Sequence, residues 1–524
     1  MVNVLIADKM SKLAEQCFLN CGIEVHVKPV MTPDELIACI GEYDGLVVRS
    51  ATKVTADVLE AASNMKVIGR AGIGVDNIDL DAATSQGVIV MNTPFGNAIT
   101  TAEHAISMIL SLARLIPQAN TSTHAGKWEN LAFMGIELMA KTLGIIGCGT
   151  IGAIVADRAQ GLKMRVIAYD PFLSLERAQD LGVEKVDLDV LFQRADIVSL
   201  HTPLTDATRE IIDAKAIKKM KDGVRIVNCA RGGLVVEEDL KAALETGKVA
   251  GAALDVLLEE PATDNPLFGM DNVVITPHLG AATTEAQEKV AVQIAEQMAD
   301  FLLTGAVANA INMAPVSAEE APKLKPYMTL AEQLGSFAGQ ATQTAYKEIT
   351  VEFEGEVAAL NCKPLTAVAL QGLLAPLLEG VNMVNAPAIA AERNIRVREI
   401  TSDGAGDYHT LITLIVTTEQ QTRSISGTLF NDEPRIVAIK GIHMDAKLGP
   451  NMLFVTNRDK PGLIGALGTL LGDAGVNIAT FNLGRAEAGG DAIALIEIDD
   501  PPSQELIDKV CCLEHVIMAK AMRF

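Results

Sequence analysis

Residues 141–152 constrain the fold of this chain more than any other stretch. They read Lys-Thr-Leu-Gly-Ile-Ile-Gly-Cys-Gly-Thr-Ile-Gly, an apolar strand, a glycine-rich turn and the start of a helix. Gly147, Gly149 and Gly152 match the G-x-G-x-x-G spacing, in which the glycines allow a tight turn, the close approach of a pyrophosphate, and packing of helix on strand. Free N–H groups at the helix start suit an anion. The stretch therefore predicts a dinucleotide-binding turn.

The residues that follow strengthen this prediction and select the dinucleotide. Residues 165–169, Arg-Val-Ile-Ala-Tyr, form a second expected strand, which ends at Asp170. A carboxylate at this place can accept hydrogen bonds from an adenosine ribose and would repel a 2′-phosphate, so the sequence favours NAD over NADP. The alternative is a glycine turn in a βαβ unit that binds no ligand. The order of strand, turn, helix, strand and acid favours the dinucleotide.

The composition bounds the number of domains and the partners. With 524 residues the chain is too long for one core, and three or four domains are expected. The formal net charge of −23 argues against nucleic acid and anionic membrane surfaces as partners. Eight cysteines show no CxxC or zinc spacing, so no metal site is expected. The chain starts directly as a strand and has no long uncharged apolar run, which leaves the reducing cytoplasm as the expected location.

The first 98 residues alternate strands and helices, which predicts a parallel sheet covered by helices. The expected strands are residues 4–7, 24–27, 45–48, 66–68 and 87–91. Arg49 and Ser50 follow the third strand, and Arg70 and Gly72 follow the fourth. Ligands of such sheets lie beyond the carboxyl ends of the strands, where two guanidinium groups suit a phosphate or a carboxylate. Surface salt bridging is an equally good interpretation of the two arginines from their spacing alone.

Residues 97–115 predict one long helix between two α/β units, a domain crossover. Thr100 and Glu103 have the spacing of a capping box near its start. Apolar residues recur along one face. His104 and His124 have no partner evident in the sequence, so a surface or core histidine is the interpretation of each.

Four further strands are expected to end at the edge of the sheet that carries the glycine turn. They are residues 196–200, 225–229, 251–256 and 272–276. The groups after them that can carry out chemistry are Arg231, Glu260 and His278. Oxidation of an alcohol needs a base for the hydroxyl proton, and histidine has the right intrinsic pKa. A carboxylate would orient the imidazole and stabilise its charged form, and an arginine would hold a substrate carboxylate. Each residue alone could be an ordinary loop or surface residue, but together they favour catalysis.

Three motifs at these strand ends resemble the signatures of D-2-hydroxyacid dehydrogenases. They are Asn-Cys-Ala-Arg-Gly-Gly at 228–233, Asp-Val-Leu-Leu-Glu-Glu-Pro at 255–261 and Thr-Pro-His-Leu-Gly-Ala at 276–281. Residues 49–53 and 69–79 narrow the resemblance to the members that oxidise 3-phospho-D-glycerate to 3-phosphohydroxypyruvate, the first step of L-serine biosynthesis. The resemblance covers essentially the whole chain.

The resemblance implies a role for each candidate residue. Arg231 would anchor the substrate carboxylate, His278 would be the general acid/base and Glu260 its partner. The substrate, with its phosphate end at the two arginines, would be contacted by Arg49, Ser50, Arg70 and Gly72. Beyond the glycine turn and Asp170, the NAD site would be lined by Thr150, Ile151, Thr202, Cys229, Ala230 and Asp255.

Two departures from the family pattern affect single contacts. Relatives often carry an arginine two residues after the Trp of a Gly-Lys-Trp segment, whereas here Trp128 is followed by Glu129 and Asn130. If that arginine reaches a neighbouring subunit's site in relatives, the contact is absent here. Ile73 replaces a threonine that is frequent in the Gly-Arg-Ala-Gly motif, which would remove a cofactor hydrogen bond.

The second half of the chain shows no catalytic constellation. A helix over 285–303 would return the chain to the first domain, and residues 314–322, with prolines and acids, predict a linker. Residues 451–524 have a β-α-β-β order that resembles an ACT domain, a ferredoxin-like amino-acid sensor. By this resemblance Asp459 and Asn477 are candidate contacts of L-serine across a subunit interface. The alternative is a dimerisation module without a ligand.

The predicted fold is α/β with four parts. A Rossmann-type NAD-binding domain (99–287) is inserted in a flavodoxin-like substrate domain (1–98 with 288–312). An α+β intervening domain (318–448) and a ferredoxin-like ACT domain (451–524) follow. The rival hypotheses are another 2-hydroxyacid dehydrogenase, such as a glyoxylate or hydroxypyruvate reductase, and an NAD-binding regulatory scaffold. The paired arginines and the sensor argue against the first, and the complete catalytic set argues against the second. Relatives commonly form tetramers, so a homo-oligomer is expected.

Overall fold

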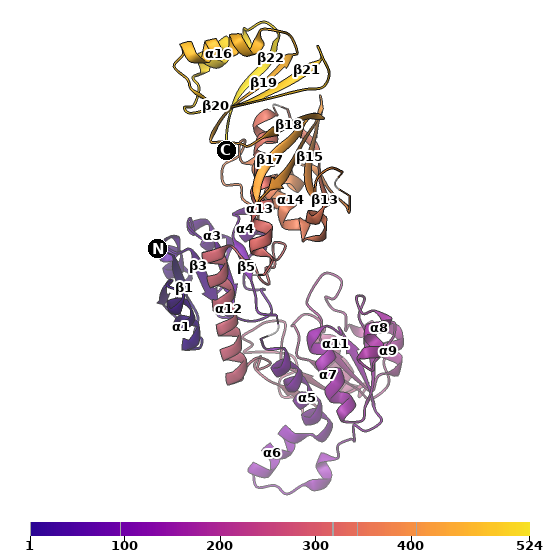
Figure 1. Ribbon diagram of the computed structural model, residues 1–524. Helices are drawn as coiled ribbons and strands as arrows, with labels where there is room; N and C mark the ends of the chain where they lie inside the picture. The colour runs from indigo at the N-terminus through magenta and orange to yellow at the C-terminus, as the bar shows by residue number, and fades with distance from the viewer. Residues whose placement is uncertain (1, 95, 317–318, 343, 405) are drawn as a thin grey trace.

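The computed structural model describes residues 2–94, 96–316, 319–342, 344–404 and 406–524. Within these residues the chain forms four β-sheets, which follow one another along an elongated molecule (Figure 1). Residue 1 and the predicted start of the intervening domain at residue 318 lie outside the described residues.

The first sheet has five parallel strands in the order β2-β1-β3-β4-β5. The strands are β1 (Asn3–Ile6), β2 (Glu24–Val27), β3 (Gly45–Val48), β4 (Val67–Arg70) and β5 (Ile89–Met91). They are connected by α1 (Lys12–Asn20), α2 (Pro33–Cys39), η1 (Ile40–Glu42), α3 (Ala56–Ala61) and α4 (Leu80–Ser85). This is the strand order of flavodoxin-like sheets, as predicted, and ligands of such sheets bind beyond the carboxyl ends of the strands.

The second sheet is also parallel, with the order β12-β11-β10-β9-β6-β7-β8. The strands are β6 (Thr142–Ile146), β7 (Arg165–Tyr169), β8 (Glu184–Lys185), β9 (Ile197–Leu200), β10 (Val224–Asn228), β11 (Val249–Leu254) and β12 (Val273–Ile275). The helices between them are α7 (Thr150–Gly161), α8 (Leu175–Asp180), α9 (Leu188–Arg194), α10 (Ala214–Lys219) and α11 (Glu237–Glu245). The order reverses between β6 and β9, which is the switch point where a Rossmann-type sheet binds its ligand.

Two helices carry the chain between these sheets. The outgoing helix is α5 (Ala98–Arg114), and the returning helix is α12 (Thr284–Thr304), which packs against α1 and β4. A Cβ on Gly69 would collide with Met298 of α12, so the sheet and this helix are in close contact.

The predicted capping box at the start of the outgoing helix is wrong. The helix begins at Ala98, and its N-cap Asn97 makes no side-chain capping hydrogen bond. Thr100 therefore lies inside the first turn, and its hydroxyl lies 3.5 Å from that of Thr283, at the start of the returning helix. The two crossing connections touch at this point.

Beyond α5 the chain forms an arm, residues 116–139, which projects away from the second sheet (Figure 1). It contains α6 (Ile116–His124) and η2 (Asn130–Phe133). Its exposed apolar side chains are Ile116, Trp128, Leu131, Met134 and Met139. Among the described helices none alone is long and apolar enough to cross a membrane; α5 and α6 reach that length only as a pair bent by 62°.

The third sheet is mixed and has the order β14-β13-β15-β16-β17-β18. Only β13 and β14 run parallel; the other neighbours are antiparallel. The strands are β13 (Tyr346–Gly355), β14 (Arg396–Ser402), β15 (Thr410–Thr418), β16 (Thr422–Phe430), β17 (Glu433–Ile439) and β18 (Ile442–Ala446). The helices are α13 (Ala321–Ala341), η3 (Glu356–Ala359), α14 (Cys362–Leu374) and α15 (Ala386–Glu392). Gly335, Gly339 and Gly372 let the backbones of α13 and α14 approach closely.

The fourth sheet completes the predicted ferredoxin-like pattern as β-α-β-β-α-β. Its antiparallel order is β20-β21-β19-β22. The elements are β19 (Asn451–Arg458), α16 (Leu463–Asp473), β20 (Ile478–Arg485), β21 (Asp491–Ile498), α17 (Gln504–Cys511) and β22 (Val516–Arg523).

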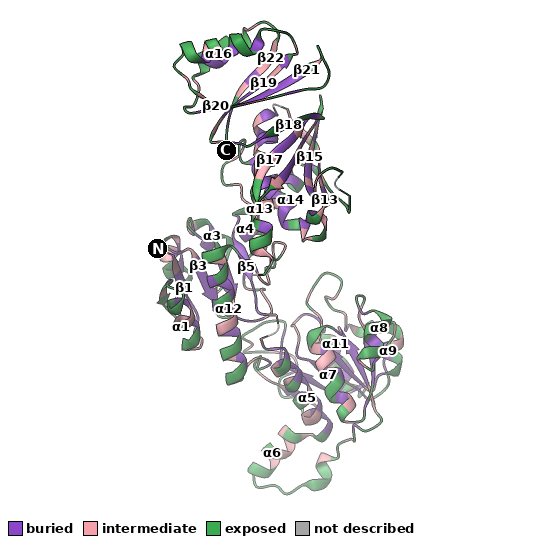
Figure 2. Ribbon diagram, in the orientation of Figure 1, coloured by how far each residue is buried: buried purple, intermediate pink, exposed green. Residues whose placement is uncertain are grey.

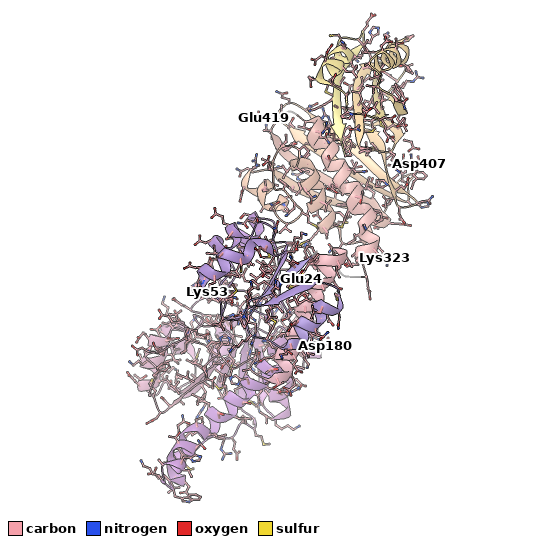
Figure 3. The ribbon with its side chains drawn as sticks, turned by 90° about the vertical axis from the view of Figure 1, so that its left-hand side faces the viewer. Glu24, Lys53, Asp180, Lys323, Asp407 and Glu419 are labelled. Carbon is pink, nitrogen blue, oxygen red and sulfur yellow. The ribbon has the colours of Figure 1, made fainter. Side chains whose placement is uncertain are left out.

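One hydrophobic core runs from the first sheet through the third to the fourth, whereas the second sheet has cores of its own. Phe337 of α13 packs edge-on against Phe454 of β19, with ring centroids 5.0 Å apart. Figure 2 shows buried residues along the interior of each sheet, and Figure 3 shows charged side chains such as Glu24, Asp407 and Glu419 on the outside. The domain of the third sheet is therefore packed onto the first domain, the domain of the fourth sheet is packed onto the third, and the second is connected to the first by the crossing helices.

Candidate active site

The glycine turn after β6 has the shape that a dinucleotide requires. Gly147 has a φ of 90°, and a Cβ there would lie 2.5 Å from the carbonyl oxygen of His201 at the end of β9. A Cβ on Gly152 would collide with the Gly147 carbonyl oxygen. At Gly149 nothing lies within 4 Å of an added Cβ, which leaves open space in front of the turn. Since Gly149 caps α7 without a side chain, the helix N–H groups of Thr150 and Ile151 are available to an anion.

Asp170 fixes this turn from the neighbouring strand. Its Oδ2 accepts the Cys148 N–H at 2.8 Å, and its Oδ1 accepts the Phe172 N–H at 2.8 Å. The side chain is partly exposed beside the turn. These observations fit a group that also receives ribose hydroxyls.

The remaining residues predicted to line the NAD site end neighbouring strands. Thr202 follows β9, and Cys229 and Ala230 follow β10. Cys229 is buried, and burial raises the pKa of its thiol, so it is an inert part of the wall.

His278 and Glu260 form the hydrogen-bonded pair that the sequence predicted. His278 Nδ1 lies 2.6 Å from Glu260 Oε2, and the two side chains are 49% and 37% exposed. The hydrogen bond to Glu260 raises the pKa of His278 above its ordinary value, against the effect of burial. Burial would raise the pKa of Glu260, but hydrogen bonds from His278 and from the Leu257 N–H outweigh it and lower the pKa. The pair is built to hold a proton on the imidazole.

A second histidine at this sheet edge is not a rival base. His201 follows β9, and its Nε2 lies 2.8 Å from the Ser199 hydroxyl. Burial lowers the pKa of His201 to about 4, so its imidazole is a weaker base than that of His278, whose pKa is raised.

Arg231 reaches across from the second domain to the first. Its Nη1 donates to the Ala230 carbonyl at 2.7 Å, and its Nε donates to Asp76 Oδ2 at 3.0 Å. A Cβ on Gly74 would collide with the guanidinium. Asp76 and Gly74 were not predicted as site residues, although both lie inside the motif at 69–79 that carried the resemblance.

The first domain contributes the other two arginines. Arg49 follows β3, and its backbone N–H donates to buried Asp8, which also accepts the Thr52 hydroxyl at 2.9 Å. Arg70 ends β4, and its Nε is buried with no hydrogen-bond partner within the described residues. Burial and the nearby Arg231 and Arg49 lower the pKa of Arg70 to about 10. The guanidinium groups of Arg49, Arg70 and Arg231 are therefore close enough to interact electrostatically.

Gly72 makes the space that Arg70 occupies. Its φ is 150°, and an added Cβ would collide with the Arg70 guanidinium. Ser50, by contrast, is exposed on the loop after β3.

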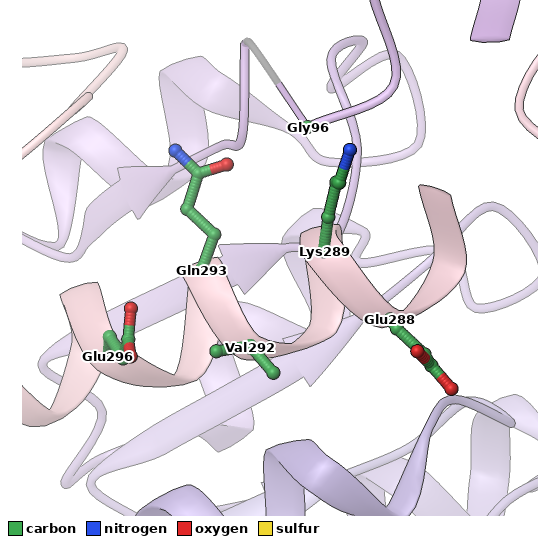
Figure 4. A pocket seen from close by; sticks show the side chains of 6 residues that line it. All are labelled: Gly96, Glu288, Lys289, Val292, Gln293 and Glu296. Atoms are coloured by element: carbon green, nitrogen blue, oxygen red, sulfur yellow. The ribbon is translucent and has the colours of Figure 1, made fainter. Parts of the chain in front are cut away.

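Two hollows adjoin the crossing helix α12. One of about 310 Å³ contains Arg49 together with Lys9, Ser11 and Thr284 among its lining residues, so it opens beside the predicted substrate site. The other, of about 460 Å³, contains none of the predicted site residues. Figure 4 shows Lys289 and Gln293 rising from α12 toward the chain at Gly96 in that hollow. It belongs to the crossing between the domains rather than to the chemistry.

His104 has the partner that the sequence did not reveal. Its Nε2 lies 3.1 Å from Asp255 Oδ1, and the side chains are 18% and 1% exposed. Asp255 was predicted to line the NAD site, and its carboxylate is turned into the protein behind His278.

The two candidate regulatory residues are engaged within the chain. Asp459 accepts hydrogen bonds from Arg485 and from the Gly489 N–H, both at 3.0 Å. Asn477 Nδ2 donates to Asp499 at 2.8 Å. They lie at the end of β19 and just before β20.

Comparison with known proteins supplies the family. Residues 106–280 match the family model described as D-isomer specific 2-hydroxyacid dehydrogenase, NAD binding domain. Residues 323–440 match the D-3-phosphoglycerate dehydrogenase intervening domain, and residues 451–511 match the ACT domain. D-3-phosphoglycerate dehydrogenase of Archaeoglobus fulgidus is 42% identical over 99% of both chains. That of Synechocystis is 44% identical over 97% of this chain and 92% of its own.

The chain belongs to the D-3-phosphoglycerate dehydrogenase family. Among solved structures, a glyoxylate reductase from Paecilomyes thermophila is 30% identical with a TM-score of 0.55, and it covers 59% of this chain and 98% of its own. The family membership confirms the predicted NAD cofactor and the order of Rossmann-type, intervening and ACT domains. The full-length matches disfavour the rival assignment to a glyoxylate reductase, since that likeness stops short of the C-terminal domains.

Proposed function

We propose that the protein catalyses the NAD-dependent oxidation of 3-phospho-D-glycerate to 3-phosphohydroxypyruvate, the first step of L-serine biosynthesis. The observation that carries this proposal is the Arg70 guanidinium, buried next to Arg49 and Arg231 with a lowered pKa. Neither Arg49 nor Arg70 forms an ion pair with any described residue. Cations held together in this way favour a ligand with more than one negative charge, such as an acid that also bears a phosphate.

The residues divide the reaction between them. Arg231 would exchange Asp76 for the substrate carboxylate, and Arg49 and Arg70 would hold the phosphate end. With Nδ1 of His278 donating to Glu260, Nε2 would be left to accept the hydroxyl proton as the carbonyl forms. Glu260 would stabilise the resulting imidazolium. NAD, held by the glycine turn and Asp170, supplies the hydride acceptor. Closure of the two domains would exclude water from the site.

The test is the initial rate of NADH formation with D-3-phosphoglycerate, compared with D-glycerate, which lacks the phosphate. We expect a far higher kcat/KM for the phosphorylated acid. Equal values for the two acids would disprove the assignment of the arginines to a phosphate. The absence of turnover with every hydroxyacid, with NAD binding intact, would support a regulatory scaffold instead.

We also propose that the protein is a homo-oligomer, a dimer or a tetramer. The arm exposes a row of apolar side chains, and Trp128 is 88% exposed on it. Contiguous exposed apolar surface of this kind marks a contact site. Asn130 lies on the same arm, so any contact with a neighbouring site would come from here. Light scattering after size exclusion should give at least twice the chain mass, and Trp128→Glu with Leu131→Glu should lower it.

For regulation we propose L-serine at the ACT domain, with Asp459 and Asn477 as its contacts. Their present partners are Arg485, which is exposed, and Asp499, and a zwitterion could replace these partly exposed contacts with little loss of stability. Addition of L-serine should slow NADH formation and should no longer do so in Asp459→Ala. If L-serine did not affect the wild type, the ACT domain would have a role in assembly only.

The eight free thiols support the cytoplasm as the location of the protein.

A further inference from the structure

The loop that carries His278 is held from behind by one carboxylate. Asp255 Oδ1 accepts the Leu279 N–H at 2.7 Å, and its Oδ2 accepts the Gly280 N–H at 2.8 Å. The Asp255 backbone carbonyl accepts the N–H of His278 itself at 2.9 Å. His278 has a φ of 55°, a left-handed conformation that is uncommon for residues other than glycine, although histidine adopts it more often than most. These contacts with Asp255 fix the backbone on which the imidazole stands.

Asp255 in turn depends on donors from two other elements. The Thr276 hydroxyl donates to Oδ1 at 2.6 Å, and His104 Nε2, from α5, lies 3.1 Å from the same oxygen. His104 Nε2 also lies 3.3 Å from the Thr276 hydroxyl. Burial would raise the pKa of Asp255, but the hydrogen bonds from His104, Thr276 and Leu279 outweigh it and lower the pKa. The buried carboxylate therefore stays charged because these donors surround it.

A second contact ties the same helix to the same loop. The Thr101 hydroxyl donates to the Gly280 carbonyl at 3.0 Å. Thr101 and His104 are three residues apart and share one face of α5. That helix starts at the crossing between the two domains, so its first turns connect the crossing with the loop of His278.

We propose that His104 is a positioning residue for His278. It acts through Asp255, whose charge and orientation it maintains, and it does not touch the reacting atoms. The inference rests on the proposed function, since it assigns His278 to the proton transfer. An ordinary core histidine would stabilise the fold and nothing more, so the two roles differ in what a substitution changes.

The experiment compares three variants in the full-length protein. His104→Leu removes the donor, His104→Gln keeps an amide donor near the position of Nε2, and His124→Leu is a matched control on exposed α6. The measurements are kcat and KM with D-3-phosphoglycerate, the dissociation constant of NADH by fluorescence, the Tm, and the primary isotope effect with substrate deuterated at C2.

We expect His104→Leu to lower kcat about tenfold or more, because small misplacements of a catalytic group are costly. KM and the NADH dissociation constant should change less than about twofold, and the isotope effect should rise because the chemical step becomes slower. His104→Gln should recover most of kcat, and His124→Leu should match the wild type. A normal kcat in His104→Leu would overturn the inference, and so would equal losses in the Leu and Gln variants that follow the Tm.

A second variant decides the case if His104→Leu does not fold. Thr276→Val removes the other side-chain donor to the same oxygen and should also lower kcat with little change in KM; an unchanged kcat would overturn the inference. A wild type without turnover would count against the proposed function. A wild type that turns over while all these variants match it would count against the inference alone.

Discussion

The first and second domains contribute opposite kinds of electrostatic environment to the proposed active site. On the first domain, the Nε of half-buried Arg70 has no hydrogen-bond partner among the described residues, and burial together with the nearby Arg231 and Arg49 lowers the pKa of its guanidinium. On the second domain, the proposed base and the histidine behind it each face a carboxylate: His278 faces Glu260, and His104 faces Asp255. Binding of an anion stabilises a cation without an ion-pair partner more than it stabilises a group that is already paired. This difference predicts that the first domain binds the phosphate end of the substrate and that the second domain carries out the proton transfer.

The second domain contributes two pairs of a histidine and a carboxylate, one near the surface and one in the interior. His278 and Glu260 are partly exposed, which the proposed proton exchange with a substrate requires. His104 and Asp255 are largely buried, and their hydrogen bonds end within the protein. Under the proposed mechanism, similar residue types would serve chemistry where they are partly exposed and positioning where they are buried.

The largest effect is expected from His278→Ala. Loss of the base should lower kcat by about a hundredfold or more, with the KM for D-3-phosphoglycerate nearly unchanged. NADH binding, measured by fluorescence, should be retained. A variant that kept its kcat and lost substrate affinity would reverse the division between the two sides.

Arg70→Met should have the opposite pattern. Removal of one or two charge-assisted hydrogen bonds should raise the KM for D-3-phosphoglycerate about tenfold to a hundredfold, and should alter that for D-glycerate far less. Because the folded protein disfavours the charged guanidinium, as its lowered pKa indicates, the Tm of the ligand-free variant should rise. Arg194→Met, which removes an exposed arginine paired with Glu184, is the control. Equal changes for both acids would defeat the phosphate assignment.

The sequence predicted what local pattern and strand direction determine. The glycine turn could be predicted because its spacing lies within one strand, turn and helix. The meeting of Glu260 with His278 could be predicted because parallel strands bring their carboxyl ends to one edge. Strand β8 was missed because it is two residues long and its residues are exposed.

Contacts between elements that are distant in sequence could not be predicted. Nothing in the sequence indicates that His104 of α5 faces Asp255, because the sequence does not show which turn of the helix packs against that loop. The contact between Arg231 and Asp76 spans two domains, so it depends on how they are joined. The prediction of a capping box was wrong because Thr100 and Glu103 have the right spacing but the helix begins earlier, at Ala98.

Glu260→Gln should change the pH dependence of kcat/KM, which tests whether Glu260 sets the pKa of His278. The carboxylate raises the pKa of His278, and the oxidation requires the imidazole unprotonated, so kcat/KM rises with pH through that pKa. Without the charge the pKa should fall, and the rise should occur at lower pH. The glutamine oxygen can still accept the Leu257 N–H, but its NH2 group then faces Nδ1 of His278 in place of the accepting oxygen. We expect kcat near the optimum to fall about tenfold because the imidazolium loses its counter-ion. An unshifted acid limb would show that Glu260 does not set the pKa, and Glu259→Gln is the neighbouring control.

The smallest effect is expected at the cofactor, from Asp170→Ser. The serine keeps an acceptor for the Cys148 N–H, so the turn is retained, but the charge that would repel a 2′-phosphate is removed. The ratio of kcat/KM with NADP to that with NAD should rise about fivefold, less than the effects above because the group touches neither substrate nor proton. Asp189→Ser, at a carboxylate paired with Lys219, is the control. If the ratio stayed constant while NAD affinity fell, Asp170 would act only by fixing the turn through its hydrogen bonds to Cys148 and Phe172. The cofactor preference would then come from another part of the second domain.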